Sequence, residues 1–207
     1  MSDPTNPLIA GELKILGFSN YLHPVNEDLI LAIGQNATEF GRAIGLQISL
    51  FDVSDFANPT RVRNFVEDAE WSTSEAQYDH KAFRYLSTSK LLILPLYIPS
   101  YASPKDFFDG FVVYDVDETK DQFSKKFNIT HVAGSQSSSD YFCWSTAKLS
   151  SRSLVFNGDA MTLKGHTILR HDLDTEEAVG YLNLDAERDS REDPCNNWYY
   201  DTPVIMN

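Results

Sequence analysis

Asp79 and His80 are the neighbouring residues whose types come closest to a catalytic arrangement in this chain. An imidazole beside the carboxylates of Glu75 and Asp79 could act as a general base or as a metal ligand. A His at the start of a strand also suits a structural hydrogen-bond network with Asp, Ser or Tyr partners, which fixes how neighbouring sheets pack. We favour the structural interpretation and keep Glu75, Asp79 and His80 as the candidates for catalysis.

Aspartates recur where apolar runs end, at Asp52, Asp115 and Asp172. An Asp side chain in such a turn accepts hydrogen bonds from backbone N–H groups two residues further on. Asp115 with Asp117, and Asp172 with Asp174, could also begin a calcium site, but the spaced Gly and distal Glu of an EF-hand loop are absent. We therefore expect no cofactor, with calcium at these two pairs as the alternative.

Composition excludes several classes of protein. The 207 residues carry 30 Asp and Glu against 17 Lys and Arg, a net charge of -13, and no cluster of basic residues. Because this charge repels a polyanion, we expect no nucleic-acid partner. The longest apolar run, from Leu91 to Ile98, contains Pro95 and is far shorter than the roughly 20 residues that cross a bilayer, so no membrane span is expected.

The cysteines and the N-terminus say little about the compartment. Cys143 and Cys195 lack the spacing of a zinc site, and a disulfide and two free thiols both remain open. The first residues lack the basic and apolar regions of a secretory signal. The residues themselves leave the localisation unknown.

An internal repeat predicts the fold. The segment GLQISLFDVSD at 45–55 is followed by related segments at 110–118 and 165–175, each with a glycine, an apolar run and then aspartates. An apolar strand precedes each segment, a weaker amphipathic strand follows it, and a further strand leads each unit. Such strands, separated by turn residues and without a helical period, predict an all-β repeat of four-stranded antiparallel sheets.

This repeat is typical of a β-propeller, and we expect a segment of about three blades plus one leading outer strand. A ring needs roughly four to eight blades to close, so an open segment leaves blade faces bare, and self-association could close it. We expect the partial propeller at 1–184, with blades at about 17–66, 67–132 and 133–184, an outer strand of a preceding blade at 2–15, and an acidic tail at 185–207.

Four motifs carry a family resemblance. They are GLQISLFDVSD at 45–55 with Asn58-Pro59, SEAQYDHKAF at 74–83, KLLILP at 90–95 and RSLVFNGD at 152–159. Together they resemble the β-propeller domain proteins, a family of secreted proteins with a C-terminal propeller distantly related to WD40 repeats. The resemblance covers about residues 2–184, with the YDHKAF string as its most specific part. It implies an extracellular location and no settled catalytic chemistry.

Propeller topology would place the long loops 35–42, 67–79, 99–109 and 133–151 on one face. Long loops on a rigid scaffold are where binding residues usually lie. Their aromatic rings could stack on sugars or cations, and their carboxylates could bind cations, hydroxyls or basic side chains. The alternative is that the rings only pack their own loops. The binding candidates are Trp71, Tyr78, Tyr101, Phe107, Tyr141 and Trp144.

Our functional hypothesis is a non-catalytic binding or interaction module whose long-loop face takes a protein, glycan or matrix ligand. The second hypothesis is a hydrolase or lyase with Glu75, Asp79 and His80 near the propeller axis. The third is a non-functional fragment of a longer propeller protein. We lean away from an enzyme, because the family resemblance implies no settled catalytic chemistry.

Overall fold

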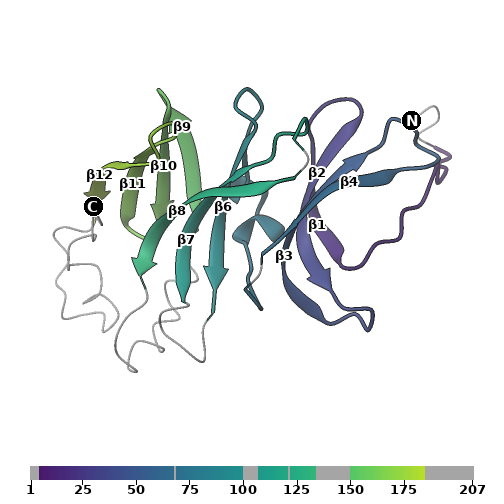
Figure 1. Cartoon of the computed structure of the whole chain (residues 1–207), viewed down its shortest axis with the longest axis horizontal. Coiled ribbons are helices and arrows are strands. Elements are labelled where there is room, and N and C mark those ends of the chain that lie inside the picture. The colour runs from purple at the N-terminus through teal and green to yellow at the C-terminus, as the bar shows by residue number, and fades with distance from the viewer. Residues whose placement is uncertain (1–4, 68, 100–106, 121, 134–149, 185–207) are drawn as a thin grey trace.

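The computed structural model describes residues 5–67, 69–99, 107–120, 122–133 and 150–184. Within these residues the chain forms twelve strands and two short 3-10 helices (Figure 1). The first strands are β1 (Phe18–Pro24), β2 (Leu29–Ala37), β3 (Ala43–Asp52) and β4 (Thr60–Val66). Next come the helices η1 (Glu75–Gln77) and η2 (His80–Ala82), followed by β5 (Arg84–Leu86), β6 (Leu91–Ile98), β7 (Phe108–Asp115) and β8 (Ser124–Ala133). The last strands are β9 (Arg152–Phe156), β10 (Asp159–Lys164), β11 (Thr167–Asp172) and β12 (Ala178–Asn183).

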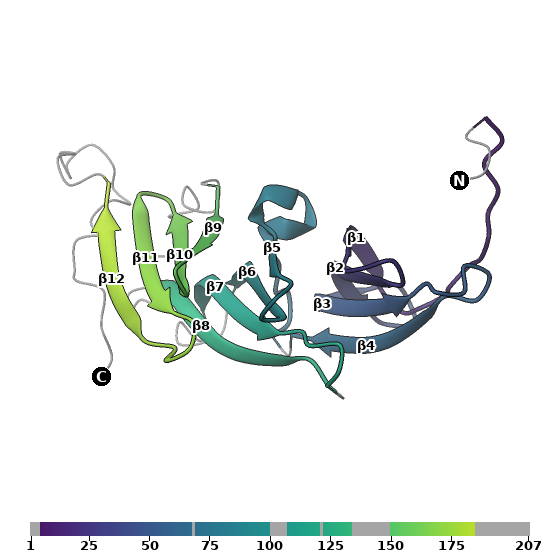
Figure 2. The same cartoon turned by 90° about the horizontal axis from the view of Figure 1, so that it is seen from above.

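The strands form three four-stranded antiparallel sheets: β1–β4, β5–β8 and β9–β12. In each sheet the strands are neighbours in chain order, so each sheet is a meander. Seen from above, the three sheets stand side by side in an open arc, with β1, β5 and β9 on its inner side (Figure 2). The expected all-β class and the four-stranded antiparallel sheets are confirmed.

The repeated aspartates occupy the same place in every sheet. Each is the last residue of the third strand of its sheet and pairs with the first residue of the second strand. In all three sheets the next residue donates its N–H back across the turn, over 2.7 to 3.0 Å. The pairs are Leu29 with Asp52, Leu91 with Asp115, and Asp159 with Asp172.

The core lies between the sheets, because alternate side chains of a strand point to opposite faces. On β6, Leu92, Leu94 and Leu96 pack toward the first sheet, in a cluster that includes residues of β2 and β3. The intervening Leu91 and Ile93 belong to a second cluster with residues of the third sheet. Burying each such side chain contributes about 1.5–3 kcal/mol, so the middle sheet is stabilised from both sides.

Two regions differ from the sequence-based expectation or leave it open. His80 lies in η2 and not in a strand, because the Asp79 side chain accepts the Lys81 N–H over 2.9 Å and closes a 3-10 turn ahead of the short β5. Residues 5–17 form no strand among the described residues, although Gly11 lies tightly against the turn at Phe56. The outer strand expected at 2–15 therefore stays a prediction.

Several predicted features lie outside the described residues. They are Tyr101, Tyr141, Trp144, Cys143, Cys195 and the acidic tail at 185–207. Within the part of the chain that the structure describes, no helix is long and apolar enough to cross a membrane.

Candidate binding face

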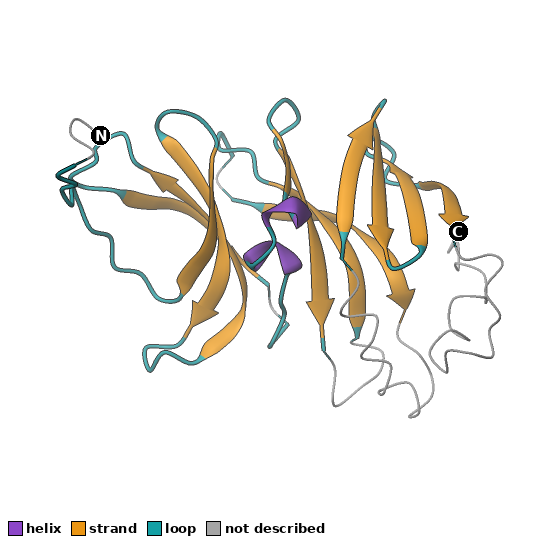
Figure 3. Cartoon of the chain, turned by 180° about the vertical axis from the view of Figure 1, so that it is seen from behind, coloured by secondary structure: helices purple, strands orange, loops and turns teal. Residues whose placement is uncertain are grey.

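The connection from β4 to β5 contains both 3-10 helices and lies between the first and third sheets (Figure 3). A capping box begins η1. Ser74 accepts a hydrogen bond from the Ala76 N–H over 3.2 Å, and the Gln77 side chain accepts from the Ser74 N–H over 2.9 Å. These two bonds give a long loop a fixed shape, which a polar segment of this length would otherwise lack.

Gln77 joins η1 to the first sheet. Its side-chain amide donates to Asn20 Oδ1 over 3.1 Å, and its oxygen accepts from Gln35 Nε2 over 3.2 Å. Asn20 lies on β1 and Gln35 on β2. Because β1 and β2 are antiparallel, the start of β1 and the end of β2 lie at the same end of the strands. The helix η1 therefore lies at the end of the first sheet that carries the β2–β3 loop.

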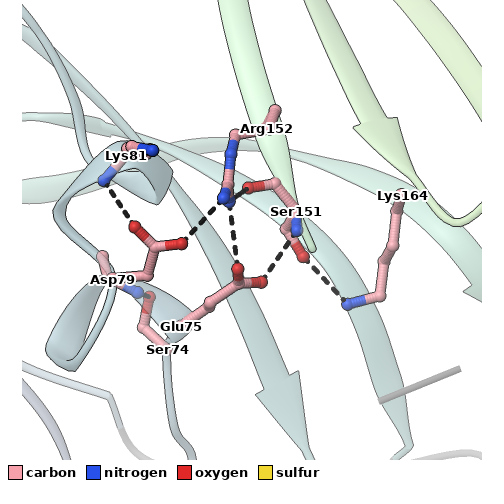
Figure 4. A network of polar contacts seen from close by, with 8 residues as sticks. Ser74, Glu75, Asp79, Lys81, Ser151, Arg152 and Lys164 are labelled. Carbon is pink, nitrogen blue, oxygen red and sulfur yellow. Dashed lines mark hydrogen bonds and ion pairs between the residues drawn. The ribbon is translucent and has the colours of Figure 1, made fainter. Parts of the chain in front are cut away.

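Arg152, the first residue of β9, joins the same helices to the third sheet (Figure 4). One guanidinium nitrogen donates to Glu75 Oε1 over 3.0 Å and the other to Asp79 Oδ2 over 2.7 Å. The second oxygen of Glu75 accepts from the Ser151 N–H over 2.8 Å. Both carboxylates are therefore bound. We call these contacts of Arg152 with Glu75 and Asp79 the clamp, and it joins the two 3-10 helices to the third sheet.

The clamp changes the acidity of Asp79. The Lys81 N–H, and then Arg152, lower the pKa of Asp79. Asp79 is therefore held ionised and is occupied by donors, which suits a structural carboxylate better than a general base.

The three catalytic candidates are only partly brought together. Glu75 and Asp79 meet at Arg152, whereas His80 is exposed at the first position of η2. The structural network expected around His80 is thus built by Arg152 instead. Arg152 was named in a sequence motif but not as a partner of the carboxylates, since the contact joins positions more than 70 residues apart.

Trp71 and Tyr78 are the predicted binding residues that the structure leaves open to solvent, at 48% and 80% exposure. Trp71 has a left-handed backbone, with φ of 64°, and its N–H donates to the Ile44 carbonyl over 2.7 Å. The Arg42 guanidinium lies 5.3 Å from the centre of the Trp71 ring. The indole is therefore fixed in place and already in contact with a cation.

Two other aromatics on this face differ from the expectation. Phe107 is half-buried, with its ring edge-on to Tyr97 at 5.8 Å between centres, so it packs against the end of β6. Phe40, in the β2–β3 loop, was not among the predicted binding residues and is 97% exposed. Its signal in the sequence was weak, a single aromatic beside a turn glycine.

A buried polar seam between the second and third sheets was also missed by the sequence analysis. Lys164 Nζ lies 2.6 Å from Asp109 Oδ1, and both side chains are nearly inaccessible. His131 Nε2 lies 2.9 Å from the Thr162 hydroxyl. Burial, followed by the charges of Lys164 and His171, lowers the pKa of His131 to about 3. Burial also raises the pKa of Asp109, although Lys164 opposes that shift.

The candidate calcium ligands are engaged in their own turns. Asp172 Oδ1 accepts from the N–H groups of Asp174 and Thr175, over 2.9 and 2.8 Å. Asp117 Oδ1 accepts from the Thr119 N–H over 2.9 Å, and Asp115 pairs with Lys120. Among the described residues, no group of three His, Cys, Asp or Glu side chains is arranged to hold a metal ion. Calcium therefore stays an untested alternative.

The amino-acid sequence matches a known family model over most of its length. The model, described as a beta propeller domain, matches residues 1–176. The chain belongs to this β-propeller domain family. The three sheets are therefore called blades from here on, and the face with the β2–β3 loop, Trp71 and Tyr78 is called the long-loop face.

Two curated archaeal relatives match about half of the chain. An uncharacterized protein of Methanocaldococcus jannaschii is 39% identical over 101 residues, which is 49% of this chain and 15% of that protein. An uncharacterized protein of Archaeoglobus fulgidus is 39% identical over 105 residues, 49% of this chain and 16% of that protein. The matched segment is thus a small part of each relative, and neither printed name gives an activity.

Proposed function

We propose that this β-propeller domain is a non-catalytic binding module that recognises a basic protein segment through its long-loop face. β-Propeller domains generally serve protein interactions, and membership of that family is the general support. The observation that carries the finer proposal is the pair Trp71 and Tyr78, two large aromatic side chains left open on a face whose backbone is fixed by η1.

The existing contact of Arg42 with Trp71 supports a cationic partner. A guanidinium within about 6 Å of an indole ring is attracted by the negative charge of the ring face, and Trp is the strongest such acceptor. Arg42 is itself exposed, so an Arg or Lys of a partner can take its place or approach the ring beside it. The indole thus supplies an anchor of the kind that dominates protein interfaces.

The charge of the protein supports the same partner. The net charge is -13, and Glu39 and Glu70 are exposed on the two segments that carry Phe40 and Trp71. Acidic side chains around an aromatic anchor attract a basic segment and repel an acidic one, which raises the association rate and sets specificity. The carboxylates of Glu75 and Asp79 contribute less, because Arg152 offsets one of their two negative charges and occupies an oxygen of each.

A displayed library of random peptides, selected on the immobilised 207-residue chain at low salt, tests this proposal. We expect enrichment of peptides that contain Arg or Lys, and weaker binding of those peptides as salt is raised. Enrichment of acidic peptides, or binding that salt leaves unchanged, would contradict the proposal. A parallel array of neutral glycans serves as the comparison, and preferential glycan binding would also contradict it.

A further inference from the structure

The β2–β3 loop carries an arginine that lies on the proposed anchor of the long-loop face. The Arg42 guanidinium carbon lies over the Trp71 ring, 5.3 Å from the ring centre. The two residues belong to different segments, the β2–β3 loop and the connection from β4 to β5. Arg42 is exposed and Trp71 is 48% exposed, so the contact is made at the surface and is not part of the core. Its main effect is therefore on what else can reach the indole ring.

The backbone of the loop holds Arg42 in a defined position. The Thr38 N–H donates to the Arg42 carbonyl over 2.9 Å, and the Thr38 hydroxyl accepts from the Arg42 N–H over 3.2 Å. The Gly41 N–H donates to the Thr38 carbonyl over 2.9 Å and closes the turn, with a left-handed φ of 80° that glycine adopts readily. None of these bonds uses the guanidinium, so Arg42→Ala removes the contact with the ring and keeps the turn.

Trp71 is bound to the first blade by its own backbone and by that of its neighbour. Its N–H donates to the Ile44 carbonyl over 2.7 Å, and the buried Ser72 hydroxyl accepts from the Leu46 N–H over 2.9 Å. A bulky residue keeps a left-handed φ of 64° only where its surroundings fix it. Because the Trp71 backbone is fixed in this way, the long and flexible side chain of Arg42 is the member of the pair that can move aside.

Arg42 offers Trp71 the same chemistry as a basic partner. The negative potential of an indole face attracts a cation, and a planar guanidinium also stacks on the ring, which a lysine ammonium does not. A partner arginine that stacks on this ring face must first displace Arg42, because both groups need the same surface.

We propose that Arg42 is an internal competitor, which occupies on Trp71 the place that an arginine of the partner takes. The inference rests on the proposed function, which supplies the basic partner. The apparent affinity falls in proportion to the fraction of molecules in which the ring is open. A contact between a cation and a ring at an exposed site is weak, so Arg42 should lower the affinity by about two- to fivefold.

The affinity of one selected arginine-containing peptide for the 207-residue chain, measured by isothermal titration calorimetry, tests this proposal. We expect Arg42→Ala to bind the peptide about two- to fivefold more tightly than the wild type. The gain should vanish when Trp71→Ala is present in both proteins, because the competition needs the ring. Lys81→Ala is the matched control, since it removes one positive charge from an exposed residue of η2, and it should give no such gain.

Nuclear magnetic resonance measures the contact itself without a peptide. The ring current of Trp71 should shift the side-chain resonances of Arg42, and Trp71→Ala should remove that shift. Arg42 resonances that are the same in both proteins would overturn the proposal.

The calorimetric outcomes separate this inference from the proposed function. Peptide binding to Arg42→Ala that is equal to or weaker than binding to the wild type would overturn the inference alone. A gain that persists without Trp71, or that Lys81→Ala reproduces, would overturn it too, because the loss of positive charge would then explain the tighter binding. Failure of every basic peptide to bind either protein would overturn the proposed function, and this inference with it.

Discussion

Arg152 at the start of β9 donates to Asp79 across 2.7 Å, and so links the third blade to the turn that enters the second. The same guanidinium holds Glu75, whose neighbour Gln77 contacts the first blade through Asn20. One connection therefore ties three blades together at the long-loop face. The binding surface that we propose depends on this connection. Along the chain, Tyr78 lies between Glu75 and Asp79, the two residues whose carboxylates Arg152 binds.

Arg152→Ala should destabilise the protein by about 1–3 kcal/mol, since it leaves two partly buried carboxylates facing each other without a cation. Arg152→Lys should recover less than half of that loss, because a single ammonium cannot bind both carboxylates in the same geometry. Urea unfolding followed by circular dichroism gives both values. Equal stability of the Lys variant and the wild type would show that charge alone matters, and not the two-point contact.

The Asp109–Lys164 pair should behave as a coupled unit. Lys164→Met leaves a buried carboxylate without its cation and is expected to cost about 3 kcal/mol. Replacing both residues, with Asp109→Leu added to Lys164→Met, should cost less than the sum of the two single changes by at least about 1 kcal/mol. The four proteins of this cycle are compared by urea unfolding. Additive losses would mean that the two charges do not interact.

Acid should weaken the protein through His131. Its pKa in the folded state is about 3, below the ordinary value of 6.5, so between these values the unfolded chain binds the proton and the folded chain does not. Stability from this group is complete above pH 6.5 and is lost as the pH falls toward 3, by about 2 kcal/mol at pH 5. His131→Gln should remove that part of the pH dependence, measured as the difference between the two stability curves. Parallel curves for the two proteins would contradict the assignment.

Calcium should leave the thermal stability unchanged. The Asp172 oxygen that could bind a cation already accepts two backbone N–H groups, and Asp115 is paired with Lys120. We therefore expect the same Tm with calcium and with a chelator, by calorimetry. A rise with calcium that Asp172→Asn abolishes would instead assign a metal site to this turn.

The blades were predictable from the sequence because the repeat is local. A glycine, an apolar run and a turn-forming aspartate recur in order, and each aspartate bonds to the backbone within its own turn. The strand pairs that follow need only short connections. This part of the fold depends on contacts between residues that are close in the chain, so the pattern of residues is enough to predict it.

The site was less predictable because its contacts join distant positions. Nothing in the spacing of Glu75 and Asp79 indicates that Arg152 lies between them, and Lys164 reads as an ordinary polar end of a strand. The 3-10 turn at His80 was missed for a different reason. There the side chain of Asp79 caps a turn where the apolar pattern suggested a strand.

In the function that we propose, the long-loop face recognises a basic segment through its open aromatic rings. The most direct test is the affinity of one selected basic peptide for the wild type, for Trp71→Ala and for Phe56→Ala, by isothermal titration calorimetry. Phe56 is also an exposed aromatic, but it lies in the β3–β4 turn at the opposite end of the first blade. We predict that Trp71→Ala weakens binding at least about tenfold and that Phe56→Ala leaves it within about twofold. Equal affinity of all three proteins would contradict the claim.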